Sequence, residues 1–578
     1  MSGSAEAGGQ ADPAVLAFDL HAAGRTAEAE TLYRRALAAA PMQPAVLHNL
    51  ALAMESNGRP TDRILAVYRI ALAIDPSYGK ADVGAGGVAF GRGMIGTALR
   101  HWGRAVRLVH DNASLWFNLG VAQQMAGDAA AAADCYAATL RLRPDDPAMW
   151  SQHLLCLNYL DLSGRGLLER HRRFGEAFGR PAAAPPPHAN APDPERRLRI
   201  GYLSVEFRSH LGGYFLAPLL ERHDRTAVEI TCYSLLPPDR EDAVTARFRT
   251  LADRWRTVDR LDNEALAAQI RADGIDILVD LAGHSGLNRL PMLALRPAPV
   301  QATWLGYPNT TGMDCVDYRI VDPVSDPPVA PGGEAWRDHA DSADAHASES
   351  LARLPGPFLC FRPPADAPAV VPLPAGARGA VTFGSFNKLA KLTDATVALW
   401  AEVLRRAPGT RLLLKDRPLS CPEIARSWRD RFAGHGIDPD RLDLLGWIAD
   451  PGGHLAAYNR IDIALDPHPY NGTITSCDLL WMGAPLVTLR GGRHAARVGA
   501  SLMTAVGLPE LVATTPDRYA DIAAGLAGDL TRLMRLRMGM RERVAASPLC
   551  DEPRFLRHLE TAYRLMWRRW CDRRRRGG

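Results

Sequence analysis

The sequence predicts an array of paired α-helices followed by two α/β domains, each built around a mostly parallel β-sheet. Three observations lead to this prediction. Glycines recur about every 34 residues in the first quarter of the chain, a Pro- and Ala-rich segment interrupts that pattern near residue 190, and short apolar runs then alternate with helical stretches. At 578 residues the chain has room for roughly three or four domains.

The repeated glycines define the first part of the chain. Their spacings are 34, 35 and 34 residues, at Gly24, Gly58, Gly93 and Gly127. An aromatic residue follows each glycine by nine or ten positions, at Tyr33, Tyr68, Trp102 and Tyr136. This is the period of the tetratricopeptide repeat (TPR), in which glycine occupies the turn between two helices and the aromatic ring fills the gap between repeats. We predict TPR repeats over residues 10–165, with a groove that binds protein or peptide partners; an unrelated helical bundle is the alternative.

The second part of the chain changes to the pattern of parallel sheets. Five runs read as strands separated by helices: Arg199–Val205, Val228–Leu235, Ile275–Leu281, Val300–Leu305 and Tyr318–Val321. A second series of five comprises Ala380–Phe386, Arg411–Lys415, Leu442–Leu445, Ile461–Asp466 and Leu486–Leu489. Residues 323–350, rich in Asp, Pro and Ala, look like a loop insert between the two series. The predicted segments are a linker at 166–197, Rossmann-like domains at 198–365 and 366–555, and a C-terminal helix with a basic tail at 556–578.

Composition excludes several classes of protein. The net charge of +4 comes largely from arginines near the C-terminus, so no nucleic-acid partner is expected. The nine cysteines are dispersed without CxxC pairs, which argues against a zinc site or a disulfide framework, and no metal is expected. We find neither a signal-peptide pattern nor an apolar run long enough for a membrane span, so we expect a cytoplasmic protein. Without a GxGxxG or GxxxxGK[ST] motif, a dehydrogenase or P-loop NTPase is disfavoured.

The segment DPHPYNGTITSCD, residues 466–478, is the sharpest local signal. It follows a predicted strand and precedes an apolar helix. Asn471 and Gly472 provide a tight turn, and Thr473 and Thr475 stand at the helix N-cap and first turn. The free backbone N–H groups there would hold a diphosphate, whereas a plain helix cap is the simpler interpretation.

Charged residues near this turn are candidates for the same site. Asp478 lies one helical turn further on, where it could accept hydrogen bonds from a ribose or simply be a surface residue. Lys391 follows the first strand of the second domain and could neutralise a leaving phosphate. Lys388 is a weaker candidate nearby, and an ordinary surface position is the alternative for both lysines.

Four histidines are further candidates. His210 follows the first strand of the first domain and could act as a general base on an acceptor hydroxyl, or orient it. His284, at the end of another strand, is its rival. His454 and His494, in the second domain, could cap or stack on a nucleotide. For His210 and His284 a structural role is the alternative, and for His454 and His494 it is a position in a surface loop.

Taken together, these stretches resemble a known family over nearly the whole chain. The motifs include GYLSVEFRSH, DILVDLAGHSGLNRL, VTFGSFNKLAKLT and DIALDPHPYNGTITSCDLLWMGAPLVTL. They are similar to the O-linked N-acetylglucosamine transferase/SPINDLY family (glycosyltransferase family 41), and the chain resembles a bacterial TPR-containing member. The resemblance implies a GT-B fold, in which two Rossmann-like domains flank a donor cleft, and a metal-independent inverting transfer of a sugar from a nucleotide donor.

The resemblance also implies roles for particular residues. His210 matches the active-site histidine, and Lys391 matches the lysine that stabilises the leaving diphosphate. His454 matches a histidine near the uracil and ribose, and Ala449 a backbone contact to the base. The stretch that contacts phosphate and ribose is matched by Thr473, Thr475 and Asp478. Three departures stand out: Ile474 replaces a usual Thr, Lys388 replaces Asn or Gln, and the usual Tyr before Ser348-Glu349 is missing.

These features lead to a ranked set of expected functions. The first is a protein O-glycosyltransferase that moves N-acetylglucosamine from UDP-GlcNAc to Ser or Thr, with the nucleotide sugar as substrate and no cofactor. The second donor is GDP-fucose, because GHSGLNRL and GYPNTTG resemble the SPINDLY branch, whose plant members transfer fucose. UDP-glucose is the third donor. A TPR scaffold whose transferase part has decayed is the alternative from another class.

Overall fold

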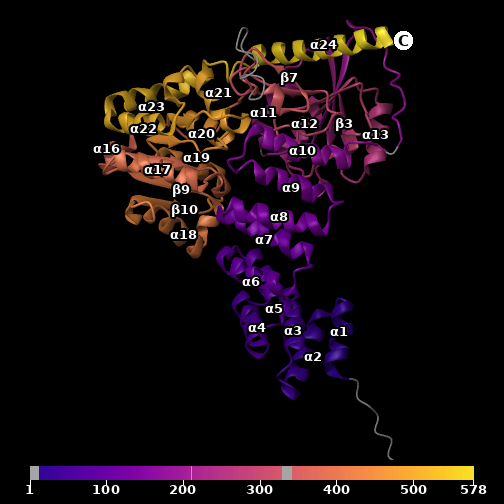
Figure 1. Cartoon of the computed structure of the whole chain (residues 1–578), viewed down its shortest axis with the longest axis vertical. Coiled ribbons are helices and arrows are strands. Elements are labelled where there is room, and N and C mark those ends of the chain that lie inside the picture. Colours follow the sequence, from indigo (N-terminus) through magenta and orange to yellow (C-terminus); the bar gives the residue numbers. More distant parts are fainter. Residues whose placement is uncertain (1–11, 182, 210, 329–341, 578) are drawn as a thin grey trace, which may run out of the picture. The chain divides into compact units, whose positions relative to one another are not determined.

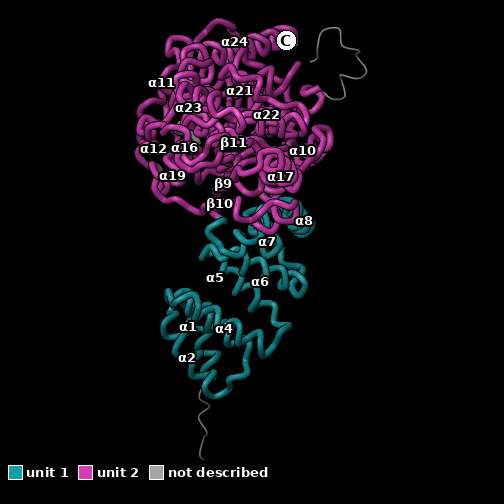
Figure 2. The backbone as a smooth tube through the Cα atoms, turned by 90° about the vertical axis from the view of Figure 1, so that its left-hand side faces the viewer, with its two compact units in different colours: residues 1–144, 418–427 teal, residues 145–417, 428–578 magenta. Residues whose placement is uncertain are grey.

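The structure, a computed structural model, describes residues 12–181, 183–209, 211–328 and 342–577. It divides into two compact units (Figure 2). The first unit holds the residues up to 144 together with 418–427, and the second holds 145–417 together with 428–578. Within the described ranges, no helix is long and apolar enough to cross a membrane.

The first unit is an array of helix pairs, as predicted. Its helices are α1 (Pro13–Ala22), α2 (Thr26–Ala39), α3 (Pro44–Ser56), α4 (Thr61–Ile74), α5 (Gly79–Gly91), α6 (Ile95–Leu108), α7 (Ala113–Ala126) and α8 (Ala129–Leu142). The glycine that follows the first helix of each pair has a positive φ, between 65° and 88°. Only glycine adopts this left-handed conformation without strain, which explains its recurrence at each turn.

The aromatic landmarks lie where the TPR pattern predicts. Tyr33, Tyr68, Trp102 and Tyr136 are each at most 3% exposed. Trp102 and Tyr136 each face a glycine on the neighbouring helix. A Cβ on Gly86 would lie 2.4 Å from the Trp102 ring, and one on Gly120 would lie 2.8 Å from the Tyr136 ring. Small residues opposite large rings therefore set the close helix approach in the array.

Two further helices follow in the second unit, and they correct the predicted linker. These are α9 (Pro147–Leu157) and α10 (Gly164–Phe178). The linker predicted to begin at 166 is helical to Phe178, because Leu167, Leu168, His171 and Phe174 give α10 a buried face. Of the predicted linker, the Pro/Ala-rich part between α10 and β1 forms neither helix nor strand in its described residues, because Pro supplies no N–H for a helix.

The first sheet has seven parallel strands in the order β3-β2-β1-β4-β5-β6-β7. Its strands are β1 (Leu198–Ser204), β2 (Val228–Ser234), β3 (Arg254–Thr257), β4 (Ile277–Asp280), β5 (Val300–Thr303), β6 (Tyr318–Val321) and β7 (Ser350–Arg353). The connecting helices include α11 (Leu211–Arg222), α12 (Ala243–Leu251), α13 (Asn263–Ala272) and α14 (Leu290–Leu293). The five predicted strands are confirmed. β3 and β7 were not predicted, because these edge strands are short and incompletely buried and carry no apolar run.

The second sheet has six parallel strands in the order β10-β9-β8-β11-β12-β13. Its strands are β8 (Thr382–Ser385), β9 (Arg411–Lys415), β10 (Leu442–Leu445), β11 (Ile463–Leu465), β12 (Leu486–Leu489) and β13 (Val512–Ala513). Helices in this part of the chain include α16 (Pro374–Arg378), α17 (Asp394–Arg406), α18 (Pro422–Ala433), α19 (Pro451–Ala457), α20 (Ile474–Trp481), α21 (Val498–Ala505), α22 (Pro516–Gly528) and α23 (Leu530–Ala545). The five predicted strands are again confirmed, and only the two-residue β13 was missed.

The last helix, α24 (Glu552–Gly577), returns to the first sheet (Figure 1). It begins four residues before the predicted boundary and continues through the basic residues that were predicted as a tail. Phe555, Leu559 and Trp567 are buried in the same core as Tyr202 and Trp304 of the first sheet. An apolar stripe at helical spacing thus closes the first domain with the end of the chain.

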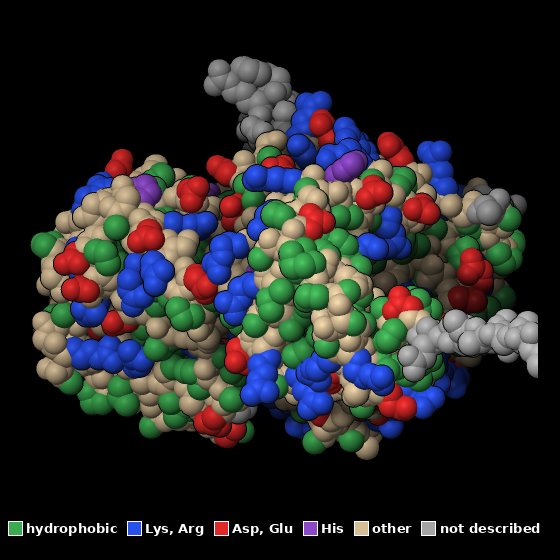
Figure 3. Space-filling model, turned by 90° about the horizontal axis from the view of Figure 1, so that it is seen from below, with side chains coloured by type: hydrophobic (Ala, Val, Ile, Leu, Met, Phe, Trp, Pro, Cys, Tyr) green, Lys and Arg blue, Asp and Glu red, His purple; other side chains and the backbone are tan. Residues whose placement is uncertain are grey.

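Charged side chains are mixed over the surface shown in Figure 3, where Lys and Arg alternate with Asp and Glu. This mixture agrees with the small net charge of +4.

We predict that Trp567→Ala strongly destabilises the second unit. Trp567 is fully buried, its Nε1 donates to the Asp193 carbonyl at 2.8 Å, and the Arg196 guanidinium lies 4.6 Å from its ring centroid. Truncating a buried tryptophan costs about 3–5 kcal/mol. The free energy of unfolding from denaturant titration measures this loss. The matched control is Trp447→Ala, which removes a 63% exposed ring and should cost less than about 0.5 kcal/mol; equal effects would contradict the packing role of α24.

Candidate functional site

The predicted site residues of the second domain gather beyond the carboxyl ends of β8 and β11. These two strands are neighbours in the sheet, and the chain continues from them in opposite directions. β9 and β10 follow on one side of β8, whereas β12 and β13 follow on the other side of β11. Such a switch point leaves a crevice where parallel sheets bind ligands. The segment after β8 carries Lys388 and Lys391, and the segment after β11 leads into α20.

The loop after β11 is held rigidly. Asp466 is fully buried, and its carboxylate accepts hydrogen bonds from the Gly472 N–H at 2.7 Å and the Thr488 hydroxyl at 2.8 Å. Asn471 is also buried and donates to the Pro467 carbonyl at 2.8 Å. Both side chains therefore position the turn that precedes α20.

The start of α20 keeps polar groups without partners. Thr473 is the N-cap residue, but its side chain makes no capping hydrogen bond. The first N–H groups of a helix have no partner within it. Ser476 Oγ and Asp478 Oδ1 are buried without a hydrogen-bond partner, and burial raises the pKa of Asp478 to about 7. Unpaired buried polar atoms are costly, so each of these two groups calls for a partner that the chain itself does not supply.

Lys391 lies against this turn. Its Nζ donates to the Asn471 carbonyl at 2.7 Å and lies 4.3 Å from the centroid of the Tyr470 ring. Burial lowers the pKa of Lys391, Lys388 lowers it further, and the charge of Asp466 opposes both effects. The structure thus brings Lys391 and the turn into one place, while Lys388 stands exposed at the start of the short helix Leu389–Lys391.

A cluster of rings beside β8 and β9 surrounds His454. The Nδ1 of His454 lies 2.7 Å from the Lys415 ammonium, and burial together with this charge lowers the histidine pKa to about 4. Phe386 and Tyr458 stack with ring centroids 4.4 Å apart, and His454 meets Tyr458 edge-on at 5.3 Å. A neutral imidazole among aromatic faces suits contact with a flat base.

Sequence reasoning found some of these positions and missed others. Phe386 and Lys415 were not singled out, although each stands at the carboxyl end of a strand, the position that marks a ligand crevice. Asn387 was also missed; it is buried and accepts a hydrogen bond from the Thr475 hydroxyl at 3.1 Å. Ala449 lies exposed in the loop between β10 and α19.

Two histidines are placed elsewhere, which corrects the expectations for them. His284 is buried, with Nδ1 3.0 Å from the Ser151 hydroxyl and Nε2 2.8 Å from the Thr311 carbonyl. With both nitrogens occupied, it offers no free base. His494 is also buried, and its Nδ1 contacts the Asp326 carboxylate at 2.5 Å, so its ring connects the segments that follow the two sheets and does not lie in a surface loop. His210 lies outside the described residues.

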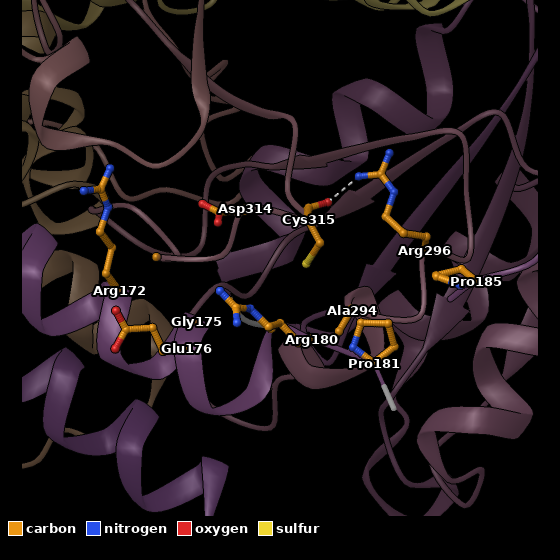
Figure 4. A pocket seen from close by; sticks show the side chains of 12 residues that line it. Arg172, Gly175, Glu176, Arg180, Pro181, Pro185, Ala294, Arg296, Asp314 and Cys315 are labelled. Carbon is orange, nitrogen blue, oxygen red and sulfur yellow. Dashed lines mark hydrogen bonds between the residues drawn. The ribbon is translucent and has the colours of Figure 1, made fainter. Parts of the chain in front are cut away.

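The cavity in Figure 4 is separate from this site. It holds about 570 Å³ and lies between α10 and the loop after β5. Arg172, Glu176 and Arg180 line one side, while Asp314 and Cys315 line the other. No predicted site residue contributes to it. Among the residues that the structure describes, no group of three or more His, Cys, Asp or Glu is placed to hold a metal ion.

Comparison with known families identifies both parts of the chain. The tetratricopeptide repeat model matches residues 16–79 and 85–147. The model of glycosyl transferase family 41 matches residues 184–331 and 372–559, more than half of the chain. The chain belongs to glycosyltransferase family 41. The second matched range contains Lys391, the 466–478 segment and the ring cluster around His454.

Relatives of this family 41 chain carry related names. It is 41% identical over 438 residues to the probable UDP-N-acetylglucosamine–peptide N-acetylglucosaminyltransferase SPINDLY of Petunia hybrida, covering 75% of this chain and 45% of that protein. It is 29% identical over 390 residues to the probable transferase SEC of Arabidopsis thaliana, covering 65% of this chain and 38% of that protein. The chain thus spans less than half the length of these relatives.

A solved structure shares the whole fold. A mutant of the O-GlcNAc transferase from Thermobaculum terrenum superposes with a TM-score of 0.77 at 38% identity, covering 92% of this chain and 98% of that one. The match confirms the predicted class, a TPR solenoid followed by two Rossmann-like domains in the GT-B arrangement.

We predict that Gly472→Ala destabilises the turn before α20. A Cβ there would lie 2.2 Å from the Ser476 hydroxyl and 2.8 Å from the Thr475 hydroxyl. Overpacking of this kind costs about 1–3 kcal/mol, which the free energy of unfolding would report. Gly492→Ala is the matched control, because a Cβ there meets nothing within 4 Å. If both variants unfold alike, the turn is not tightly packed.

Proposed function

We propose that this family 41 chain is a protein O-glycosyltransferase that moves N-acetylglucosamine from UDP-GlcNAc to Ser or Thr hydroxyls, with inversion and without a metal. The observation that carries the proposal is the hydrogen bond from Lys391 to the Asn471 carbonyl, because it places a cation beside the open N-terminus of α20. The names of the SPINDLY and SEC relatives and of the Thermobaculum terrenum enzyme support the choice of donor.

The proposed step is a direct displacement. The acceptor oxygen forms a bond to the anomeric carbon of the sugar as the bond from that carbon to the diphosphate oxygen breaks, and the hydroxyl proton passes to a base. The family resemblance assigns that base, or the orientation of the acceptor, to His210. Lys391 and the first N–H groups of α20 stabilise the departing negative charge. Removing one such donor from an active site typically costs about 3–4 kcal/mol of transition-state stabilisation.

The electrostatics of Lys391 suit this role. Burial lowers the pKa of Lys391, because the ammonium is desolvated next to Lys388. A bound diphosphate adds negative charge within reach and favours the charged amine again. The donor therefore raises the lysine pKa and favours the ammonium at the step where the charge is needed.

The nucleoside is assigned to the other side of the crevice. His454, neutral at pH 7, and Ala449 contact the base, while the unpartnered Asp478 carboxyl accepts a ribose hydroxyl. The TPR array supplies the groove for protein acceptors, which lowers the entropic cost of bringing the hydroxyl to the sugar.

GDP-fucose is the second candidate donor. The chain is 41% identical to the SPINDLY relative of Petunia hybrida and 29% identical to SEC, and this greater similarity to SPINDLY favours the donor of that branch. Ile474 also removes one hydroxyl near the proposed phosphate site, which bears on the affinity for the donor. UDP-glucose is the third donor to compare, and a scaffold without activity is the alternative from another class.

We predict turnover with UDP-GlcNAc, and loss of that turnover in Lys391→Ala. Hydrolysis and peptide transfer are measured with UDP-GlcNAc, GDP-fucose and UDP-glucose. Lys391→Ala should lower kcat by about 10²–10³-fold, because a leaving-group donor is lost. The exposed Lys388→Ala is the matched control and should change kcat only a few-fold, about what a solvent-screened charge contributes.

Two results would contradict the proposed transferase activity or the role of Lys391 in it. Near-normal kcat in Lys391→Ala removes the lysine from its role. No turnover with the three donors, together with no binding of UDP or GDP by calorimetry, favours the scaffold.

We also predict that the Tyr470 ring sets the upper pH limit of activity. Activity falls as pH rises through the pKa of Lys391, since only the ammonium stabilises the leaving group. Tyr470→Leu removes the ring face under the ammonium, lowers the lysine pKa, and should move the basic limb of the kcat profile down by about one pH unit. Tyr470→Phe keeps the ring and should leave the limb in place. A shift in both variants would instead assign it to the tyrosine hydroxyl.

A further inference from the structure

A second cavity, of about 670 Å³, lies beside the loop that follows β11. Its walls come from the α9–α10 connection and from the segment around the short helix His494–Ala496, with His468 and Pro469 between them. None of Lys391, Thr475 and Asp478 lines it, so it is distinct from the proposed donor site.

Two partly or fully buried arginines line this cavity without a carboxylate partner. Arg493 is 9% exposed; its Nη2 donates to the carbonyls of Asn158 at 3.0 Å and Leu160 at 2.6 Å, and its Nη1 is buried with no partner. The Nε of Arg497 donates to the Gly491 carbonyl at 2.7 Å. The hydrogen bonds of both guanidinium groups, among the residues described, go to carbonyl oxygens alone.

Burial therefore disfavours the charged form of both arginines. It lowers the pKa of Arg493 to about 10 and also lowers that of Arg497. Asp161 and Asp326 oppose these shifts only through their charge, without a hydrogen bond to either guanidinium. A buried cation that lacks a counter-ion is expensive, and an anion in the cavity would offset that cost.

A helix N-terminus adds to the positive potential. α10 begins at Gly164 in the cavity wall, where the Ser163 hydroxyl accepts from the Gly166 N–H at 3.1 Å. Arg165, 76% exposed, stands in the first turn. Among the described residues that line the cavity, Asp161 is the one carboxylate, against the three arginines 165, 493 and 497. Arg165 also pairs with Glu169, which does not line the cavity, at 3.2 Å. The wall thus combines an N-terminal dipole with an excess of cations, an arrangement that binds oxyanions.

We propose that this cavity is a binding site for an oxyanion, a carboxylate or phosphate group, held by Arg493, Arg497 and the N-terminus of α10. The volume falls in the range of ligand pockets and exceeds what a bare oxyanion fills, so the group is carried on a larger molecule such as an acidic or phosphorylated polypeptide. The proposal goes beyond the proposed transfer and does not depend on the donor sugar.

The test is a titration of the full chain with inorganic phosphate at fixed ionic strength, in which phosphorus NMR detects binding. Arg497→Gln should raise the Kd for phosphate about tenfold, the value of one charge-assisted hydrogen bond. Arg165→Gln, at an exposed position where folding is not at risk, should raise it about threefold. Arg260→Gln, at a 90% exposed arginine that does not line the cavity, is the matched control and should leave Kd within about twofold.

One further variant distinguishes this cavity from the donor site. Lys391→Ala should leave phosphate binding intact; if it abolishes binding while Arg497→Gln and Arg165→Gln do not, the phosphate occupies the donor site and the proposal fails. No phosphate binding, or equal Kd in all variants, also overturns it. UDP affinity, measured in parallel, should not change in Arg497→Gln.

Peptide probes identify the molecule that carries the oxyanion. Peptides with phosphoserine or glutamate that bind more tightly than phosphate, and weaken in Arg497→Gln, identify a polypeptide source. Peptides that bind no better than phosphate identify a free anion in the same cavity.

Discussion

The hydrogen bond between Lys391 and the Asn471 carbonyl is the contact on which the candidate site depends. It joins segments that are 80 residues apart and follow different strands. Its geometry requires a turn that cannot move, and Asp466 supplies that constraint by holding the Gly472 N–H and the Thr488 hydroxyl from within the sheet. A buried carboxylate, a fixed turn and an ammonium over the Tyr470 ring therefore form one unit.

Around this unit the structure leaves polar groups unsatisfied. Ser476 Oγ and Asp478 Oδ1 have no partner, and the N-cap residue Thr473 does not cap its own helix. In a folded interior such groups cost free energy unless a ligand completes them. The proposed nucleotide diphosphate and its ribose would relieve this unfavourable arrangement, which is how a preorganised site gains affinity.

Contacts between the two sheets keep the crevice in register. The His494 imidazole meets Asp326, the Ser501 hydroxyl donates to Asp322 at 2.6 Å, and Arg493 reaches the carbonyls after α9. Helix α24 follows the second sheet in the chain, yet its apolar face belongs to the core of the first. These links explain why residues that looked like ligand contacts in the sequence, His494 above all, serve to connect the domains.

The sequence by itself determined the class of fold, because the TPR spacing, the apolar strands and the turn after β11 are local patterns governed by backbone conformation and hydrophobic periodicity. It also pointed to Lys391 and the 466–478 segment, since residues at the ends of parallel strands share one edge of a sheet. Only the tertiary structure decided which histidines were available, that α10 continues into the predicted linker, that α24 packs on the first domain, and that Phe386, Asn387 and Lys415 join the site. These outcomes depend on contacts between residues that are far apart in the sequence. Such contacts determine the burial and the hydrogen-bond partners of each side chain, so a local stretch of sequence cannot predict them.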